Sequence, residues 1–298
     1  MKAEQFEELP KGIHRIHRLP DSALGEQWDS IIVDQTVKDQ LLSQAVVNFT
    51  VRRKISRSIL PLHGTTLLVG PPGTGKTTLA RGLAHKTAEV LNGAEFTLLE
   101  VDPHALSSAM MGKTQKAVSD LFGITIAEYA MAGPTIVLLD EIEALAVDRS
   151  KLSLDANPVD IHRATDAVLV QLDALADRHP NLLFVATSNF PQAVDAAFTS
   201  RCDLILDIPL PNKKACADIL ENCLEGLAST FKPVGKLLAD PNLSSVADAL
   251  YGLDGRSIRK VVANALTFRR EVAVEPSRLS ISDLKSAADA AHSVRTTR

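Results

Sequence analysis

The chain of 298 residues has only three cysteines, no long apolar run and no excess of basic residues. Cys202, Cys216 and Cys223 form neither a C-x-x-C metal spacing nor an even set for disulfides, which fits a reducing compartment. No apolar run approaches the roughly 20 residues of a membrane span, and the charged N-terminus lacks the apolar core of a signal peptide. The net charge of −4 gives no overall basic field that would attract nucleic acid. We therefore expect a cytoplasmic protein with no membrane segment, and the charge argues against a nucleic-acid partner.

Internal repeats and low-complexity tracts are also absent, and the length favours about two domains. Fully apolar strands that alternate with helices predict an α/β fold with a parallel sheet covered on both faces. These short apolar runs lie at residues 65–69, 95–101, 135–139, 182–187 and 204–208. Beyond residue 210 only helical stripes remain, at 213–229, 243–250, 255–270 and 280–293. The sequence thus predicts an α/β domain over residues 28–210 and a small all-α lid domain over residues 211–298.

Residues 1–27 precede the first organised segment, which opens at Trp28. After an acidic start, residues 11–18 read Lys-Gly-Ile-His-Arg-Ile-His-Arg, in which basic residues alternate with isoleucine as they would in a strand. Two interpretations stay open here. One is a mobile or loosely docked arm, and the other is a short tail that binds a partner or a neighbouring subunit.

Residues 70–77 read Gly-Pro-Pro-Gly-Thr-Gly-Lys-Thr, between an apolar strand and a helix-forming segment. In this context, G-x-x-x-x-G-K-T predicts a loop whose backbone N–H groups bind phosphates. Lys76 brings a positive charge to the β- and γ-phosphates, and the Thr77 hydroxyl completes a Mg²⁺ shell. The alternative is a glycine-rich turn that happens to end in Lys-Thr. The predicted nucleoside triphosphate-binding residues are Gly70, Pro71, Pro72, Gly73, Thr74, Gly75, Lys76, Thr77 and Thr78.

An acidic pair follows the apolar run at residues 135–139. The carboxyl ends of parallel strands are where open α/β sheets bind ligands, so Asp140 and Glu141 are placed at a site. Asp140 is suited to holding Mg²⁺, and Glu141 to polarising the attacking water as a general base. The alternative is a pair of carboxylates that only begins a helix.

Three further polar residues complete the pattern. Asn189 follows the next strand, where it can orient the lytic water, although an asparagine also suits a turn. Arg201 lies before the last strand, where it can reach a neighbouring subunit's nucleotide, and the alternative is a surface ion pair with Asp203. Arg256 begins a helix of the small domain and can close on the phosphates.

The motifs along the chain are, in order, GPPGTGKT, VLLDE, ATSN, an arginine before the last strand, and GR at the start of a later helix. The order of these motifs resembles that of the AAA+ ATPases. More narrowly, the chain resembles the pachytene-checkpoint (thyroid-receptor-interactor) ATPases, which remodel HORMA-domain proteins. The resemblance extends over about residues 27–292. The stretches that carry it are residues 27–32, 140–145, 166–173, 186–189, 194–198 and 252–260.

The resemblance implies an ATPase that uses ATP and Mg²⁺ and assembles into a homohexameric ring. It assigns Lys76 and Thr77 to phosphates and Mg²⁺, Asp140 and Glu141 to the acidic pair, Asn189 to the first sensor, Arg201 to the inter-subunit finger and Arg256 to the second sensor. Residues 104–113 fall where the family carries its substrate-gripping pore loop, and residues 149–162 where it carries the second. The family usually has aromatic residues in the first loop, whereas this chain has Met110 and Met111. Methionine can still grip an extended chain, and the alternative is that the pair fills a core gap.

Eukaryotic members carry a folded N-terminal domain that the residues before Trp28 are too few to form. This resembles the compact bacterial members, which act on HORMA proteins in antiphage signalling of the CBASS type. We expect a negative regulator that pulls a HORMA protein off its partner. The main alternative is an AAA+ nucleic-acid motor or clamp loader; a small-molecule kinase and an unfoldase that feeds a protease are further alternatives.

Overall fold

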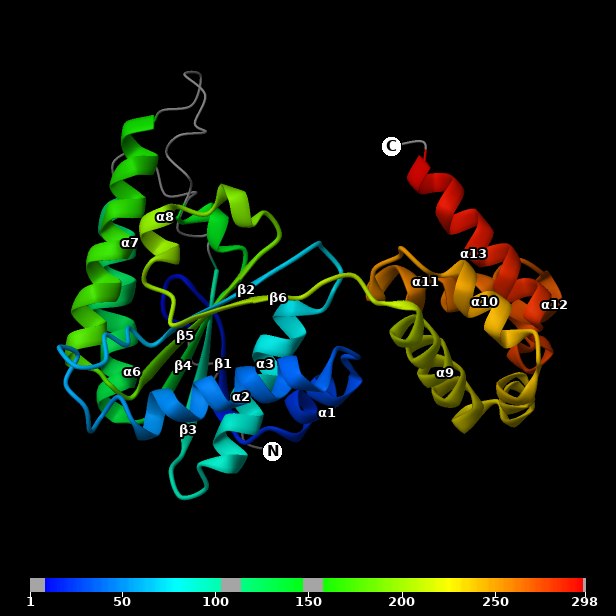
Figure 1. The fold of residues 1–298 in the computed structure, drawn as a ribbon, viewed down its shortest axis with the longest axis horizontal. Helices are drawn as coiled ribbons and strands as arrows, with labels where there is room; N and C mark the ends of the chain where they lie inside the picture. The colour runs from blue at the N-terminus through cyan, green and yellow to red at the C-terminus, as the bar shows by residue number, and fades with distance from the viewer. Residues whose placement is uncertain (1–8, 103–113, 147–157, 297–298) are drawn as a thin grey trace, which may run out of the picture. The chain divides into compact units, whose positions relative to one another are not determined.

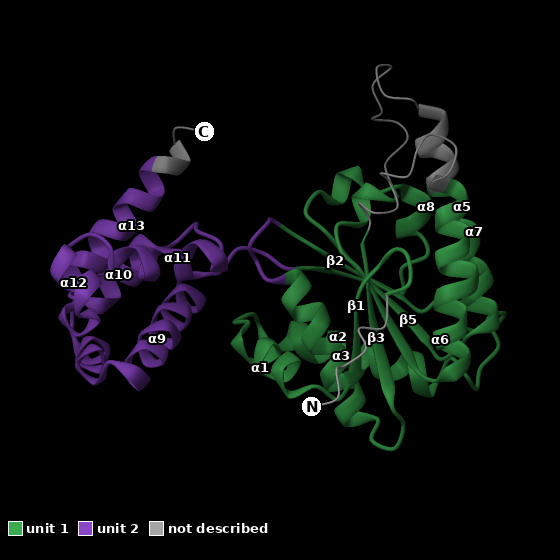
Figure 2. Ribbon diagram, turned by 180° about the vertical axis from the view of Figure 1, so that it is seen from behind, with its two compact units in different colours: residues 1–70, 76–207 green, residues 71–75, 208–298 purple. Residues whose placement is uncertain are grey.

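The structure is a computed structural model that describes residues 9–102, 114–146 and 158–296 (Figure 1). The chain divides into two compact units (Figure 2). The first comprises the residues up to Gly70 and Lys76–Asp207, and the second comprises Pro71–Gly75 and Ile208–Arg298. Within the described ranges, no helix is long and apolar enough to cross a membrane.

The first unit is built on one six-stranded sheet with the order β1-β3-β4-β5-β2-β6. Its strands are β1 (Ile13–Leu19), β2 (Thr65–Val69), β3 (Phe96–Val101), β4 (Thr135–Leu139), β5 (Leu182–Ser188) and β6 (Leu204–Asp207). Strands β2 to β6 all run parallel, and β1 pairs antiparallel with β3. The predicted α/β fold with a parallel sheet is therefore confirmed, with one antiparallel edge strand added.

Helices cover both faces of this sheet (Figure 1). One layer contains α1 (Ser22–Ser30), α2 (Gln35–Thr50) and α3 (Lys76–Val90); the other contains α5 (Thr114–Asp120), a π-helical turn (Leu121–Ile126), α6 (Ala127–Ala132) and α7 (Pro158–Arg178). Alternate strand residues face opposite sides, so Val137 and Leu139 join the core against α5–α7, whereas Ile136 and Leu138 face α3. Because both faces are buried, the strands are apolar throughout, which is why the sequence identifies them.

Residues 9–27 differ from the predicted arm, because they are part of this fold. β1 forms the edge of the sheet, with Ile13 opposite Val101 and Leu19 opposite Phe96. Both Ile13 and Leu19 are buried, so the alternation of isoleucine with basic residues marks an edge strand with one apolar face. The alternation indicates a strand, but its partner lies about 80 residues away, which local periodicity does not reveal.

A buried network of charges fastens β1 to the sheet and to α3. Glu100 of β3 is 3% exposed, and its carboxylate accepts two hydrogen bonds from Arg81 at 3.0 and 2.7 Å. His17 Nε2 lies 2.9 Å from the same carboxylate. Burial raises the pKa of Glu100, but the hydrogen bonds and charges of His17 and Arg81 outweigh burial and lower that pKa to about 2.

We expect Glu100→Gln to lower the free energy of unfolding by about 3 kcal/mol at neutral pH. A carboxylate whose pKa is lower in the folded chain stabilises it above the unfolded pKa, which is about 4.5. This contribution is lost as the pH falls toward about 2. Urea unfolding of both proteins at a series of pH values between 7 and 3 measures the difference. A difference that stayed constant over this range would contradict a charged Glu100 as its cause.

The second unit is helical. It contains α9 (Lys213–Thr230), a 3₁₀ segment (Lys232–Ala239), α10 (Leu243–Ala249), α11 (Gly255–Ala265), α12 (Arg270–Val274) and α13 (Ile281–Thr296). Its core is formed by residues such as Leu220, Leu224, Val246, Val261 and Leu284, each at most 1% exposed. Asn212 and Asp254 cap α9 and α11 by accepting hydrogen bonds from backbone N–H groups.

Candidate active site

The first turn of α3 holds two residues of the predicted phosphate loop. Lys76 is 5% exposed, and its ammonium donates a hydrogen bond to the Gly70 carbonyl oxygen at 2.8 Å. The Thr77 hydroxyl donates to Asp140 Oδ1 at 2.7 Å, which joins this helix to the end of β4. The start of α3 therefore lies against the acidic pair, as the strand–loop–helix pattern predicts.

The ends of β4 and β5 bring the acidic pair and Asn189 together. The two strands are neighbours in parallel register, with Leu139 opposite Ala186, so the residues that follow them meet at one edge. Asn189 Nδ2 donates to Glu141 Oε1 at 3.3 Å. The backbone N–H of Asn189 donates to Glu143 Oε1 at 3.1 Å.

Thr187, two residues before Asn189, connects the Asp140 carboxylate to the backbone of Glu141. Its hydroxyl donates to Asp140 Oδ1 at 2.5 Å and accepts a hydrogen bond from the Glu141 N–H at 3.1 Å. Glu141 has φ 52° and ψ 54°, and among the described residues other than glycine it alone has a positive φ. Left-handed backbone is unfavourable for a residue with a Cβ and is found where the surroundings impose it, often at functional sites.

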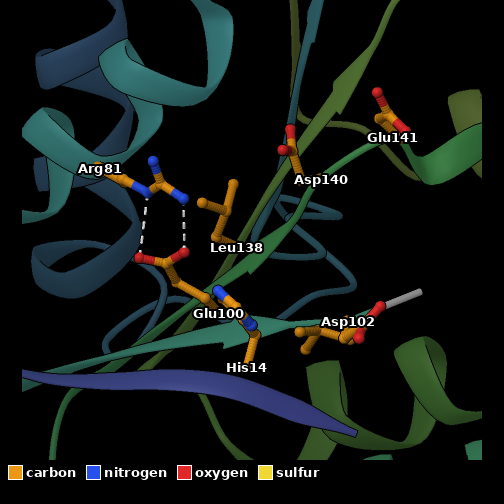
Figure 3. A pocket seen from close by; sticks show the side chains of 8 residues that line it. His14, Arg81, Glu100, Asp102, Leu138, Asp140 and Glu141 are labelled. Carbon is orange, nitrogen blue, oxygen red and sulfur yellow. Dashed lines mark hydrogen bonds and ion pairs between the residues drawn. The ribbon is translucent and has the colours of Figure 1, made fainter. Parts of the chain in front are cut away.

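A pocket of about 290 Å³ opens beside the acidic pair, at the carboxyl ends of β3 and β4 (Figure 3). It is lined by His14, Arg81, Glu100, Val101, Asp102, Leu138, Asp140 and Glu141. Figure 3 shows Arg81 and Glu100 joined by two parallel bonds at its wall, while Asp140 and Glu141 stand at its upper end. The described N-terminal residues therefore contribute to the surroundings of the site through His14, which the sequence did not indicate.

Residues Pro71–Gly75 of the loop belong to the second unit, together with the start of α11. Gly73 has φ +82°, and a Cβ there would lie 2.0 Å from Asp254 Oδ1, so only glycine fits without a shift. The backbone N–H of Arg256 donates to the Gly73 carbonyl oxygen at 3.1 Å. The Arg256 side chain is exposed, and its role as second sensor stays a prediction.

Arg201 makes an ion pair, but its partner is not Asp203, the residue named in the alternative interpretation. Its guanidinium donates to both carboxylate oxygens of Asp173 on α7, at 2.9 and 2.7 Å. The hydrogen bond from Arg201 lowers the pKa of Asp173, which is held in the charged form. The carboxylate of Asp203 instead accepts from the backbone N–H groups of His63 and Gly64 at 2.8 and 2.7 Å. This ion pair neither supports nor excludes a role for Arg201 as the inter-subunit finger, which stays a prediction.

The structure thus brings Lys76, Thr77, Asp140, Glu141 and Asn189 to one edge of the sheet. Met110 and Met111 lie outside the described residues, as does most of 149–162. Sequence reasoning missed Thr187 and Asp173, although both lie in stretches that carry the family resemblance. Thr187 comes two residues before Asn189, so its position near the end of a strand could have indicated that it belongs to the site.

The donor set fits the predicted cofactors. The Thr77 hydroxyl and the Asp140 carboxylate are hard oxygen donors, the kind that Mg²⁺ prefers, and they lie 2.7 Å apart. The buried ammonium of Lys76 needs an anionic or carbonyl partner, and a triphosphate supplies the former.

Comparison with known proteins agrees with this geometry. Residues 66–210 match the model of the ATPase family associated with various cellular activities (AAA). The chain is 64% identical over 287 residues to CD-NTase-associated protein 6 of Pseudomonas aeruginosa, covering 96% of this chain and 94% of that protein. It is 30% identical over 292 residues to the pachytene checkpoint protein 2 homologue of Danio rerio, covering 89% of this chain and 68% of that protein.

Two solved structures share the fold. A structure of C. elegans PCH-2 superposes with a TM-score of 0.75 at 24% identity, over 95% of this chain and 76% of that one. A chain from the E. coli MS115-1 HORMA:CdnC:Trip13 complex superposes with a TM-score of 0.70 at 20% identity, over 93% of this chain and 94% of that one. The predicted family is thereby confirmed: the chain belongs to the AAA ATPases, in the group of CD-NTase-associated protein 6 and the pachytene checkpoint protein 2 homologues.

Proposed function

We propose that the chain hydrolyses ATP and uses the energy to remodel a HORMA-domain protein, as a subunit of a homohexameric ring in the bacterial cytoplasm. The observation that carries the ATPase part is the hydrogen-bonded chain Thr77–Asp140–Thr187–Glu141–Asn189. It joins the helix of the phosphate loop to the ends of two strands, so that phosphate-binding, metal-holding and base residues meet at one place.

Each residue then has a separate task. Lys76 and the loop backbone bind the phosphates of ATP. Thr77 and Asp140 hold Mg²⁺, which neutralises charge on the phosphates when bound. Glu141 accepts a proton from the attacking water, and the Asn189 amide orients both the water and the Glu141 carboxylate. Arg201 supplies positive charge to the nucleotide of a neighbouring subunit, and Arg256 links the lid to the nucleotide state.

The HORMA part rests on the relatives. A protein 64% identical to this chain is named for its association with a CD-NTase, and a structural neighbour is part of a HORMA:CdnC:Trip13 complex. We propose a corresponding role here, in which ATP hydrolysis removes a HORMA protein from its partner and so restrains CBASS signalling.

The proposal is tested by mixing the purified chain with a bacterial HORMA-domain protein that is bound to a fluorescent peptide or to a CD-NTase. We expect the complex to dissociate with ATP and Mg²⁺ and to persist with a non-hydrolysable analogue. ATP hydrolysis without dissociation would leave the ATPase assignment standing and overturn the HORMA assignment. A rate of ATP hydrolysis that rises when DNA is added, and falls again as the salt concentration is raised, would instead favour a nucleic-acid motor.

Met110→Ala/Met111→Ala should retain ATP hydrolysis and lose this dissociation. A remodelling ring must hold an extended chain without reading its sequence, and flexible apolar methionines can repack around varied side chains. ATPase rate and peptide release, measured on the same preparation, separate the two properties. Normal release by the double variant would remove both residues from the substrate path.

A further inference from the structure

The Thr187 hydroxyl both donates and accepts a hydrogen bond at the acidic pair. The residue is 2% exposed, and its hydroxyl proton goes to Asp140 Oδ1 at 2.5 Å while its oxygen accepts from the Glu141 N–H at 3.1 Å. A hydroxyl has a single proton to donate, so the donor capacity of Thr187 is committed to Asp140. Both hydrogen bonds connect β5 to residues that follow β4.

The bond to Glu141 bears on the conformation of that residue. Glu141 has φ 52°, a backbone conformation that is unfavourable for any residue with a Cβ. The direction of its side chain follows from this turn, and the acceptor for its N–H is Thr187 Oγ1. Removal of the hydroxyl would therefore release the turn that aims the Glu141 carboxylate.

The bond to Asp140 is independent of the phosphate loop. Asp140 Oδ1 also accepts from Thr77, but Thr77 lies on α3 and is itself a proposed metal ligand. Thr187 comes from β5, whose residues are all buried, so its bond to the Asp140 carboxylate does not depend on α3 or the phosphate loop. The competing interpretation is a buried threonine that merely fills space at a strand end.

We propose that Thr187 is a positioning residue that sets both the Asp140 carboxylate and the Glu141 backbone for ATP hydrolysis. The inference rests on the proposed function, because Asp140 and Glu141 act in that reaction. It adds a residue that acts through Asp140 and Glu141, and in which the hydroxyl matters rather than the size of the side chain.

The kinetic test compares Thr187→Val, which keeps the shape, Thr187→Ala, which also removes the methyl, and Thr187→Ser, which keeps the hydroxyl. Thr66→Val serves as the matched control, since Thr66 is a 1% exposed threonine on β2, outside the acidic pair's contacts. We expect valine and alanine to lower kcat by about 10²-fold, the size of a small misplacement of catalytic groups, with KM nearly unchanged. Serine and the Thr66 control should stay within about threefold of the parent, since no positioning bond is lost.

Amide exchange of the nucleotide-free protein gives a second readout, without ATP or metal. The Glu141 N–H should exchange faster with solvent in Thr187→Val and Thr187→Ala and at the parental rate in Thr187→Ser. A folded Thr187→Ala with parental kcat and parental exchange would overturn the proposal, even if the valine variant failed to fold. A serine variant as slow as the valine one would show that the methyl matters and overturn it equally. If the parent hydrolysed no ATP, the proposed function would fail, while amide exchange would still decide whether Thr187 holds Glu141.

Discussion

Arg201→Ala should lower kcat for ATP by about 10³-fold or more while ATP binding stays intact. A guanidinium at a subunit boundary stabilises charge that develops on the phosphates of the neighbour's nucleotide, and it does so mainly in the transition state. Loss of an interaction made only in the transition state lowers kcat and leaves substrate affinity unchanged. Titration with a fluorescent nucleotide and a steady-state ATPase assay measure the two quantities.

Asp173→Asn is the matched control for this variant. In the described chain, Arg201 donates two hydrogen bonds to Asp173 and a third to the Ala197 carbonyl oxygen at 2.7 Å. If the ion pair with Asp173 were the whole role of Arg201, both substitutions would affect thermal stability alike and leave kcat similar. A finger role predicts that only Arg201→Ala loses most of its activity.

Action on a neighbour has a specific signature in mixed rings. Arg201→Ala subunits keep an intact phosphate loop, and Lys76→Ala subunits keep an intact finger, so each is inactive alone. Where a Lys76→Ala subunit presents its Arg201 to an Arg201→Ala subunit, one complete site exists. We expect partial recovery of activity on mixing. If rings shown by native mass spectrometry to contain both chains stayed inactive, Arg201 would not act in trans.

The sequence predicts the parallel strands and the site at their ends because both depend on local pattern. Strands buried on both faces are apolar throughout, and polar residues that follow them must meet where parallel neighbours end. The meeting of Asp140, Glu141 and Asn189 follows from this pattern. A phosphate-binding loop is predicted because a glycine-rich turn between a strand and a helix has few other uses.

The features that the sequence does not predict depend on contacts between residues far apart in the chain, which a single sequence does not reveal. The strand β1 has a clear alternation, yet its place beside β3 depends on pairing with that strand and on Glu100, whose partners His17 and Arg81 lie far from it in the chain. The same holds for Asp173, which lies 28 residues before Arg201. Asp203 is close to Arg201 in the sequence, but its carboxylate accepts hydrogen bonds from backbone N–H groups and does not pair with Arg201. Proximity in sequence therefore suggested the wrong partner.

Glu141→Gln should bind ATP as tightly as the parent and hydrolyse it about 10²–10⁴-fold more slowly, the usual contribution of a general base. An amide has the shape of the carboxylate but cannot take a proton from water. Its carbonyl oxygen can still accept the hydrogen bond that Asn189 Nδ2 donates at 3.3 Å, so the substitution removes basicity and keeps geometry. Binding is measured by nucleotide titration, and hydrolysis by a single-turnover chase.

Glu143→Gln is the control, because it changes a second carboxylate on the same turn. Glu143 Oε1 accepts the backbone N–H of Asn189 at 3.1 Å, and a glutamine oxygen can accept it as well. The base role belongs to Glu141 alone if Glu143→Gln loses much less activity than Glu141→Gln. Equal losses would mean that the turn needs negative charge rather than one base. Parental turnover by Glu141→Gln would remove Glu141 from proton transfer and leave Asp140 as the remaining carboxylate of the pair to be tested.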